Sequence, residues 1–217
     1  FKPDFVWIKV RNQTGSHYLV DSVRGLGTGD SYRALDTAGS SSEYSNDNDM
    51  LRSLNSDGFT LDNNADTTFY VNRSSDTYVA WCWKAGGAAV SNTDGDVTSQ
   101  VSVNEEAGFS IVSFTTAAGS GFSIGHGLSK APEVILMKNR DYANNWDVYH
   151  HKNGSNPEQY RLILNSTTTR QQQPYLDNTV PTSTVFRTRG NGNWYNGGNK
   201  IIAYCWYAVP GYSDYGS

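Results

Sequence analysis

The chain of 217 residues is long enough for one large β domain or two of about 100 residues, and it combines 37% apolar residues with 13% aromatic and 18% charged ones. The frequent aromatic and β-branched residues exclude a disordered chain, and a net charge of −4 without a basic stripe argues against nucleic-acid binding. No apolar run approaches the roughly 18–20 residues of a membrane-spanning helix, so no membrane insertion is expected.

The first predicted element is a strand in residues 3–11, with the sequence PDFVWIKVR. Its two faces begin with Phe5 and Val6 and are both apolar at first, which predicts a strand in the centre of a sheet. The chain begins inside this strand without the pattern of a secretory signal, which indicates a piece of a longer protein.

A second apolar strand is predicted in residues 78–83, YVAWCW, and both of its faces suggest burial. The first β unit therefore covers residues 1–87. Residues 88–107 are rich in Gly, Ser, Asn and Asp, which predicts a surface linker with a short strand near residues 97–103.

Within this linker, residues 92–96 (NTDGD) loosely match a calcium-binding loop. The segment lacks the run of acidic residues and the bidentate Glu that such a loop requires. We therefore expect a turn here and no metal or other cofactor, with Asp94 and Asp96 as weak Ca²⁺ candidates.

The second β unit is predicted in residues 108–217. Its strands are bounded by turn signals and are expected at residues 108–115, 122–124, 146–150 and 160–164. The first two flank a turn at residues 118–121 and suggest a hairpin.

The chain also repeats itself. Residues 3–11 match residues 132–140 in order, and residues 78–83 match residues 201–206. We therefore predict an all-β fold, a tandem pseudo-repeat of antiparallel, jelly-roll-like β-sandwich units. The repeat leaves open whether each unit folds alone or supplies half of one sandwich.

Other matched residues of the repeat invite chemical interpretations. Cys82 and Cys205 are predicted to be separately buried thiols, since a bridge would require both near a pseudo-twofold axis. The cations Lys9, Arg11, Lys138 and Arg140 suggest either an anion site or, as we favour, ion pairs at strand ends.

The most interesting surface candidate is a turn-prone polar segment that carries two large rings, Asn193, Trp194, Tyr195 and Asn196. Exposed rings flanked by amides suit a sugar, whose apolar face stacks on the ring while its hydroxyls bond to the amides. The alternative is that these rings pack under a loop.

Two further groups are weaker sugar-binding candidates. The first unit has Tyr70 and Asn72 at the matching place, and Trp146 with His150 forms the other group. His150 and His151 are adjacent on a predicted strand and should point to opposite faces, which disfavours a shared metal. No catalytic signature is present, so no catalytic residue is predicted, although paired carboxylates for glycoside cleavage need no fixed spacing.

Several segments spread over nearly the whole chain form a recognisable set, namely residues 3–11, 21–25, 55–60, 78–87, 108–112, 125–128, 131–133, 145–150, 202–206 and 211–213. This set resembles a duplicated domain of proteins from marine bacteriophages, especially cyanophages, and ocean metagenomes. The resemblance implies a virion protein of the tail-fibre, tail-spike or capsid-surface type. Trp206 stands where the family usually has Phe, which is a packing change.

The sequence thus favours a non-enzymatic adhesion module on the phage surface or tail, or otherwise extracellular. Its expected partners are a host cell-surface glycan, other virion proteins and further copies of itself. The alternatives are an architectural tail-fibre or capsid-decoration module without a ligand and, less favoured, a fragment of a polysaccharide depolymerase.

Overall fold

The structure is a computed structural model that describes residues 1–28, 31–44, 51–61, 71–119, 121–189 and 197–216. These residues form strands and one short 3₁₀ helix: β1 (Phe5–Val10), β2 (His17–Asp21), β3 (Gly27–Thr28), β4 (Ser31–Tyr32), β5 (Leu35–Asp36), β6 (Leu51–Asn55), β7 (Gly58–Leu61), β8 (Tyr78–Trp83), β9 (Val90–Asn92), β10 (Ser99–Asn104), β11 (Phe109–Thr115), β12 (Phe122–Gly125), β13 (Val134–Asn139), β14 (Asp147–His150), η1 (Pro157–Gln159), β15 (Tyr160–Ile163), β16 (Gln171–Gln172), β17 (Val185–Thr188) and β18 (Lys200–Trp206). The predicted all-β fold of antiparallel sheets is confirmed. No helix in these ranges has the length and apolarity that a bilayer crossing requires.

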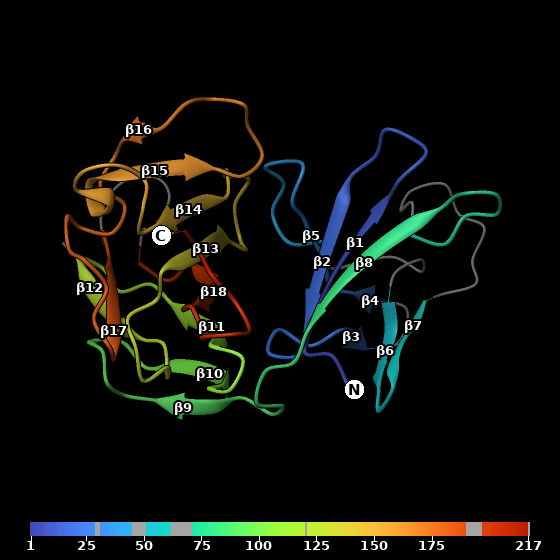
Figure 1. Cartoon of the computed structure of the whole chain (residues 1–217), viewed down its shortest axis with the longest axis horizontal. Helices are drawn as coiled ribbons and strands as arrows, with labels where there is room; N and C mark the ends of the chain where they lie inside the picture. Colours follow the sequence, from blue (N-terminus) through green and yellow to red (C-terminus); the bar gives the residue numbers. More distant parts are fainter. Residues whose placement is uncertain (29–30, 45–50, 62–70, 120, 190–196, 217) are drawn as a thin grey trace.

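The sheets stack in layers along the long axis of the molecule (Figure 1). A four-stranded sheet, β5-β2-β1-β8, faces an eight-stranded sheet, β16-β15-β14-β13-β18-β11-β10-β9. The β6–β7 hairpin covers the outer face of the smaller sheet, and the β12–β17 pair covers the outer face of the larger one. Each sheet thus buries apolar side chains on both of its faces, which explains why its central strands are apolar throughout.

The matched segments of the sequence occupy like places in the two sheets. Strand β1 lies between β2 and β8, and β13 lies between β14 and β18. In β1 and β8, Phe5 lies opposite Trp83, and in β13 and β18 the matched residues Val134 and Trp206 lie opposite each other. The remaining pairs along both ladders correspond in the same way. The hydrogen bond from Arg11 N to Thr77 O likewise corresponds to that from Arg140 N to Lys200 O. The prediction of a central strand in residues 3–11 is confirmed, whereas duplication of an ancestral segment stays a prediction.

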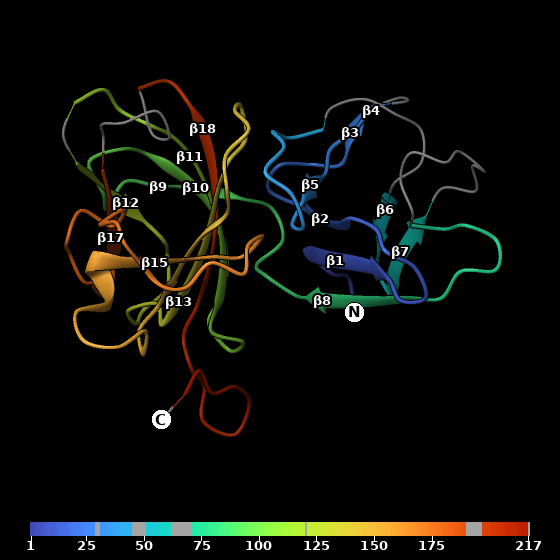
Figure 2. The ribbon, with the colours of Figure 1, turned by 90° about the horizontal axis from the view of Figure 1, so that it is seen from above.

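The predicted linker segment contains the short strand expected near residues 97–103, as β10, and a further strand, β9, that was not expected. Residues 88–107 contain β9 and β10, which continue the eight-stranded sheet beyond β11. Figure 2 shows the chain passing from β8 to these strands as the crossing between the two sheets. Gly86 lies tightly on β10, since a Cβ there would be 2.4 Å from Val103 O. A segment of small polar residues forms strands here because β11 offers a neighbouring edge.

Two further strand predictions need correction. Strands β11 and β12 do not form a hairpin, because β12 pairs with β17 and lies in the outer layer, while β11 pairs with β10 and β18. Strand β8 is not buried, because it forms the edge of the four-stranded sheet and Ala80 and Trp81 are exposed.

A shared apolar core joins the two sheets. Phe5 projects from β1 and its ring lies 4.9 Å from Tyr204 and 5.8 Å from Phe109, measured between ring centroids. Trp146 is fully buried in the same layer, and its ring nitrogen donates a hydrogen bond to Asp36 O at 2.8 Å. The two sheets therefore form the halves of one sandwich-like core and bury their facing surfaces together.

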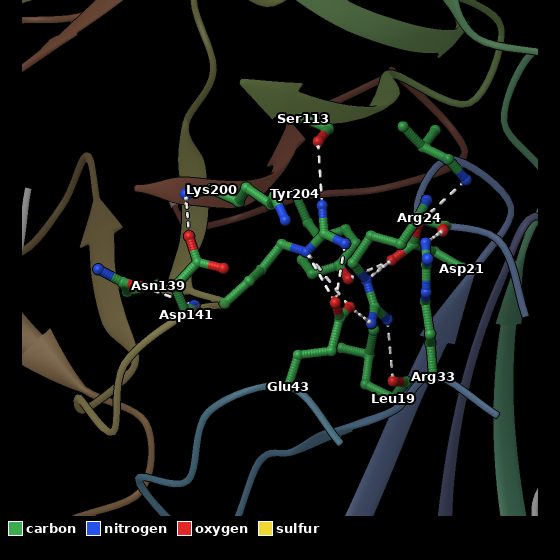
Figure 3. A network of polar contacts seen from close by, with 12 residues as sticks. Leu19, Asp21, Arg24, Arg33, Glu43, Ser113, Asn139, Asp141, Lys200 and Tyr204 are labelled. Atoms are coloured by element: carbon green, nitrogen blue, oxygen red, sulfur yellow. Dashed lines mark hydrogen bonds and ion pairs between the residues drawn. The ribbon is translucent and has the colours of Figure 1, made fainter. Parts of the chain in front are cut away.

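A polar network crosses this interface beside the apolar core (Figure 3). Arg24 pairs with Asp21 and, at 2.7 Å, with Glu43, whose other carboxylate oxygen accepts a hydrogen bond from Arg140 at 2.8 Å. Tyr204 donates its hydroxyl to Asp21 at 2.6 Å. Burial alone would raise the pKa of Glu43, but the two arginines outweigh it and lower that pKa. Each buried charge thus has an opposite partner, which a buried network requires.

The matched cations differ in their surroundings. Arg140 forms the ion pair that was expected of it, while Arg11 is exposed. Lys138 is fully buried, and its ammonium donates to Asn144 O at 2.7 Å and to Ser40 O at 3.2 Å. Burial lowers the pKa of Lys138 to about 8. The interpretation as ion pairs therefore holds for Arg140, whereas Lys138 satisfies its charge with carbonyl oxygens.

Candidate functional site

Most of the predicted sugar-binding segment lies outside the described residues. This applies to Asn193, Trp194, Tyr195, Asn196 and Tyr70. Asn72 is described and is exposed just before β8. The predicted ring-and-amide site at these places therefore stays a prediction.

Trp146 is buried, contrary to the prediction of a sugar-binding site at this residue. It is fully buried between the two sheets, where its ring stacks on Tyr204 with a centroid separation of 6.4 Å. A ring that is packed on both sides and hydrogen-bonded through its nitrogen has no face for a sugar. Trp146 is buried because the start of β14 lies opposite β5 across the interface between the two sheets, a contact between residues far apart in the sequence.

His150 does not join Trp146 in a common site. It ends β14 and is half-buried, and its Nδ1 accepts a hydrogen bond from Lys152 N at 3.1 Å. The His150 and His151 rings lie 5.5 Å apart, measured between ring centroids. They do not point to opposite faces of a strand as expected, because β14 ends at His150. Burial and the neighbouring His151 lower the pKa of His150.

The two acidic candidates for calcium have other partners. Asp94 accepts a hydrogen bond from the Asn92 amide at 2.8 Å, which closes the turn. Asp96 accepts hydrogen bonds from the backbone and hydroxyl of Ser123, both at 2.8 Å. These Ser123 hydrogen bonds come first among the causes that lower the pKa of Asp96. Within the described ranges, no three His, Cys, Asp or Glu side chains gather as a metal site.

Both cysteines are free thiols, as predicted. Cys205 is fully buried, and burial raises the pKa of its thiol. Cys82 occupies the matched place on the edge strand β8 but is only half-buried. The predicted burial of both thiols therefore holds for one of them.

The structure brings together a different set of residues, which we call the Trp7 cleft. It is an open hollow of ≈ 700 Å³ at the junction of the two sheets, and Trp7, His17, Thr37, Ala38, Leu164, Asn165, Ser166 and Thr167 line it. Strands β1 and β2 and the segment after β5 form one wall, and the segment after β15 forms the other. Its volume lies in the range of small-ligand sites, about 300–1,000 Å³.

Trp7 supplies the apolar surface of the cleft. Along one face of β1, Phe5 is fully buried, Trp7 is half-buried, and Arg11 at the strand's end is exposed. Trp7 thus lies at the boundary between the buried interface core and the exposed end of this face of β1. Its ring nitrogen donates to Thr37 Oγ1 at 2.8 Å, which fixes the plane of the indole.

Trp81 extends this apolar surface beyond the cleft. It pairs directly with Trp7 across β1 and β8, and the two ring centroids are 5.8 Å apart. Trp81 is 44% exposed, which is unusual for so large a ring. The two indoles, whose planes are tilted by 56°, form a continuous apolar surface that begins in the cleft and ends at the sheet edge.

Hydroxyl and amide groups form the rim. The Asn165 side chain accepts a hydrogen bond from Trp146 N and donates one to Asn145, both at 2.9 Å, so its position is fixed. Ser166 and Thr167 are exposed. Burial and the nearby Lys9 lower the pKa of His17, which favours its neutral form. The described residues that line the cleft include no carboxylate, lysine or arginine.

This arrangement suits the binding of a neutral ligand that has one apolar face and several hydroxyls. An indole stacks on apolar CH groups, and a rigid amide and hydroxyls exchange hydrogen bonds with polar ones. The lining offers no acid and base pair for glycoside cleavage.

The sequence pattern predicted that Trp7 and Trp81 lie in buried strands, and it did not indicate this site. One signal was present, because Phe5, Trp7, Lys9 and Arg11 share a face that changes from apolar to charged. An aromatic residue at such a transition tends to lie at a boundary. Nothing in the sequence distinguishes β8 as an edge strand, so the exposure of Trp81 had no comparable signal.

The family of the chain follows from its sequence as a whole. The family model described as "Domain of unknown function (DUF7483)" matches residues 1–217, so the chain belongs to that family. Neither the curated proteins nor the solved structures contain a match.

Proposed function

We propose that the chain is a glycan-binding adhesion module and that the Trp7 cleft holds the sugar. The observation that carries this proposal is the half-buried Trp7 indole in an open cleft whose rim bears hydroxyls and a fixed amide. One sugar ring would lie against Trp7, and the next residue of the glycan would reach Trp81.

The charge of the cleft supports a neutral glycan over other ligands. A phosphate or nucleic-acid ligand needs lysine or arginine contacts, and none lines the cleft among the described residues. A purely apolar ligand would displace water from Asn165 and the rim hydroxyls without replacing the hydrogen bonds of that water, which costs free energy. A polyhydroxylated ring meets both requirements.

The setting of the function rests on the resemblance to marine bacteriophage proteins. In that setting the chain is a component of a virion surface or tail, and the ligand is a glycan of the host cell surface. Within the virion, its further partners are other virion proteins and copies of the same chain.

A glycan array tests the proposal with three variants. Thr167→Trp fills the cleft from an exposed position, and Trp7→Ala removes its apolar floor. We expect each to weaken glycan binding about tenfold or more, which corresponds to about 1.4 kcal/mol. Tyr142→Ala is the matched control, because it deletes an exposed ring (57%) outside the cleft and should leave binding unchanged.

Circular dichroism of each variant establishes that the fold is retained. If no glycan on the array binds the wild-type chain, or if Thr167→Trp binds as well as the wild type, the Trp7 cleft is not the site. Turnover of a host polysaccharide would instead favour the less supported proposal, a depolymerase fragment.

The architectural alternative is favoured by a separate observation, the exposed edge of the four-stranded sheet at β8. It predicts that no glycan binds and that the chain forms a defined homo-oligomer. Light scattering measures the oligomer, so that one protein sample serves both tests.

A further inference from the structure

The outer edge of β8 presents backbone groups in a regular pattern. The bond from Arg11 N to Thr77 O marks a hydrogen-bonded pair in the register of β1 and β8. Since bonded and non-bonded pairs alternate in an antiparallel ladder, Val79, Trp81 and Trp83 bond to β1. The N–H and C=O groups of Tyr78, Ala80 and Cys82 therefore point away from β1. Within the described part of the chain, no strand pairs with β8 on that side.

The matched strand β18 shows how such an edge is completed. It pairs with β13 in the register that relates β8 to β1, and its other side carries β11. Hydrogen bonds from Tyr207 N to Gly108 O and from Thr116 N to Asn199 O mark two bonded pairs of this ladder. Since bonded and non-bonded pairs alternate between them, the residues of β18 that bond to β11 are Ile201, Ala203 and Cys205. These three residues correspond to Tyr78, Ala80 and Cys82.

The side chains at the two edges differ accordingly. Ala203 and Tyr204 are fully buried, while the corresponding Ala80 and Trp81 are exposed. Strand β8 contains no charged residue and no proline, which are the usual protections of an edge against pairing with another strand. Its sequence is therefore suited to a neighbour that the described residues do not supply.

A hollow lies beside Trp83, where a strand added to β8 would place the side chain that corresponds to Phe109 of β11. On β18, the ring of Phe109 stacks on Trp206 with centroids 5.0 Å apart. On β8, the corresponding Trp83 borders a hollow of ≈ 440 Å³, which is lined by Phe1, Cys82, Trp83, Lys84, Asn104, Glu106, Ala107 and Tyr212. Phe1 and Tyr212 are 64% and 65% exposed, so this hollow has an apolar rim as well.

We propose that the edge of β8 binds an extended strand from another polypeptide, antiparallel to β8 and patterned like β11. An aromatic residue lies opposite Trp83 and enters the hollow, a small residue lies opposite Cys82, and an aliphatic residue lies opposite Trp81. Main-chain hydrogen bonds to Tyr78, Ala80 and Cys82 supply affinity, and the hollow supplies specificity. Both proposals use Trp81, but the Trp7 cleft itself is bounded by β1, β2 and the segments after β5 and β15, whereas the strand site is the backbone edge of β8, so neither proposal depends on the other.

Disulfide trapping with a synthetic peptide tests the register directly. The peptide has the sequence of residues 107–116, with Ser110→Cys, because Ser110 pairs directly with Cys205 on the template strand. In the proposed complex this cysteine lies opposite Cys82, at the Cα separation of about 5.5 Å that a disulfide accepts. Cys205 is fully buried and does not compete.

The matched control peptide carries Ser113→Cys instead and has the same composition. Its cysteine would lie opposite Val79, too far from Cys82 for a disulfide. In a thiol–disulfide buffer, we expect the Ser110→Cys peptide to cross-link at least about tenfold more than the control, and only to a chain that retains Cys82. Equal yields from both peptides, or no cross-link from either, would overturn the proposal.

A backbone variant tests the hydrogen bonds. Ala80→Pro removes an N–H that points away from β1, whereas Ala80→Val keeps it. We expect trapping to fall about tenfold in the proline variant and to persist in the valine variant, with circular dichroism unchanged in both. Trapping that is equally strong in Ala80→Pro would overturn the proposal. A dimer of the chain alone that is abolished by Ala80→Pro would also overturn it, because β8 of a second copy would then be the occupant.

Discussion

The strand pairs β1–β8 and β13–β18 have the same register, but β8 is the edge of its sheet whereas β18 lies inside its sheet. Strand β18 pairs with β13 on one side and with β11 on the other, and other layers pack on both of its faces. Ala203, Tyr204 and Cys205 are therefore fully buried. β8 ends its sheet, and its matched residues Ala80, Trp81 and Cys82 are exposed or half-buried. Strand pairing therefore follows the local pattern, whereas burial depends on what the rest of the chain places beside each pair.

The largest expected difference is between Tyr204→Ala and Trp81→Ala. Tyr204 is fully buried, contacts Phe5 and donates a hydrogen bond to Asp21, so its truncation leaves a cavity and removes one of the hydrogen bonds that the buried Asp21 carboxylate accepts. We expect a loss of about 3–5 kcal/mol of unfolding free energy. Trp81→Ala removes a half-exposed ring and should cost about 1 kcal/mol or less. Denaturation in urea measures both, and similar losses would mean that β8 is covered in solution.

The next difference concerns the matched arginines. Arg140→Met leaves the interface carboxylate of Glu43 with Arg24 as its remaining ion-pair partner, and we expect a loss of about 3 kcal/mol. Arg11→Met changes an exposed residue and should alter stability by less than about 0.5 kcal/mol. The same urea titrations compare the two variants. A loss in Arg140→Met no greater than that in Arg11→Met would show that the polar network adds no stability to the interface.

The smallest expected effect is a pH dependence that comes from Lys138. Burial lowers its pKa to about 8, from an ordinary value of 10.5 that it regains when the chain unfolds. Between these values the unfolded state binds the proton and the folded state does not, so stability rises with pH. From pH 8 to pH 10, we expect wild type to gain about 1–2 kcal/mol relative to Lys138→Met.

Lys9→Met is the matched control for this experiment, because it alters the equivalent lysine and keeps Lys138. It should show the same rise with pH as the wild type. If Lys138→Met follows that rise as well, Lys138 is not the group responsible.

Parts of the fold could be predicted because they depend on local pattern. The alternation around Phe5 and Val6 predicted β1 as a central strand, and the apolar runs ending at Thr115 and His150 predicted β11 and β14. Other parts depend on distant neighbours. Strand β9 was not predicted and forms on the edge of β10, and β12 pairs with β17 in another layer instead of with β11.

The candidate site was less predictable than the fold. The sequence suggested that rings beside amides and hydroxyls would bind a glycan, but Trp146 is packed against Tyr204 and bonded to Asp36. Trp7 and Asn165 meet only because the two sheets face each other. Their separation along the chain gives no local signal of that contact.

The sequence by itself determined the class of the fold and the position of several of its strands, including the central strand β1. The alternation of apolar and polar residues involves only near neighbours in the sequence, and it suffices to indicate a strand. Only the tertiary structure decided which strand is an edge, which ring is exposed and which lysine is buried. Those properties depend on the layer that packs against each strand, and that layer comes from residues far away in the sequence.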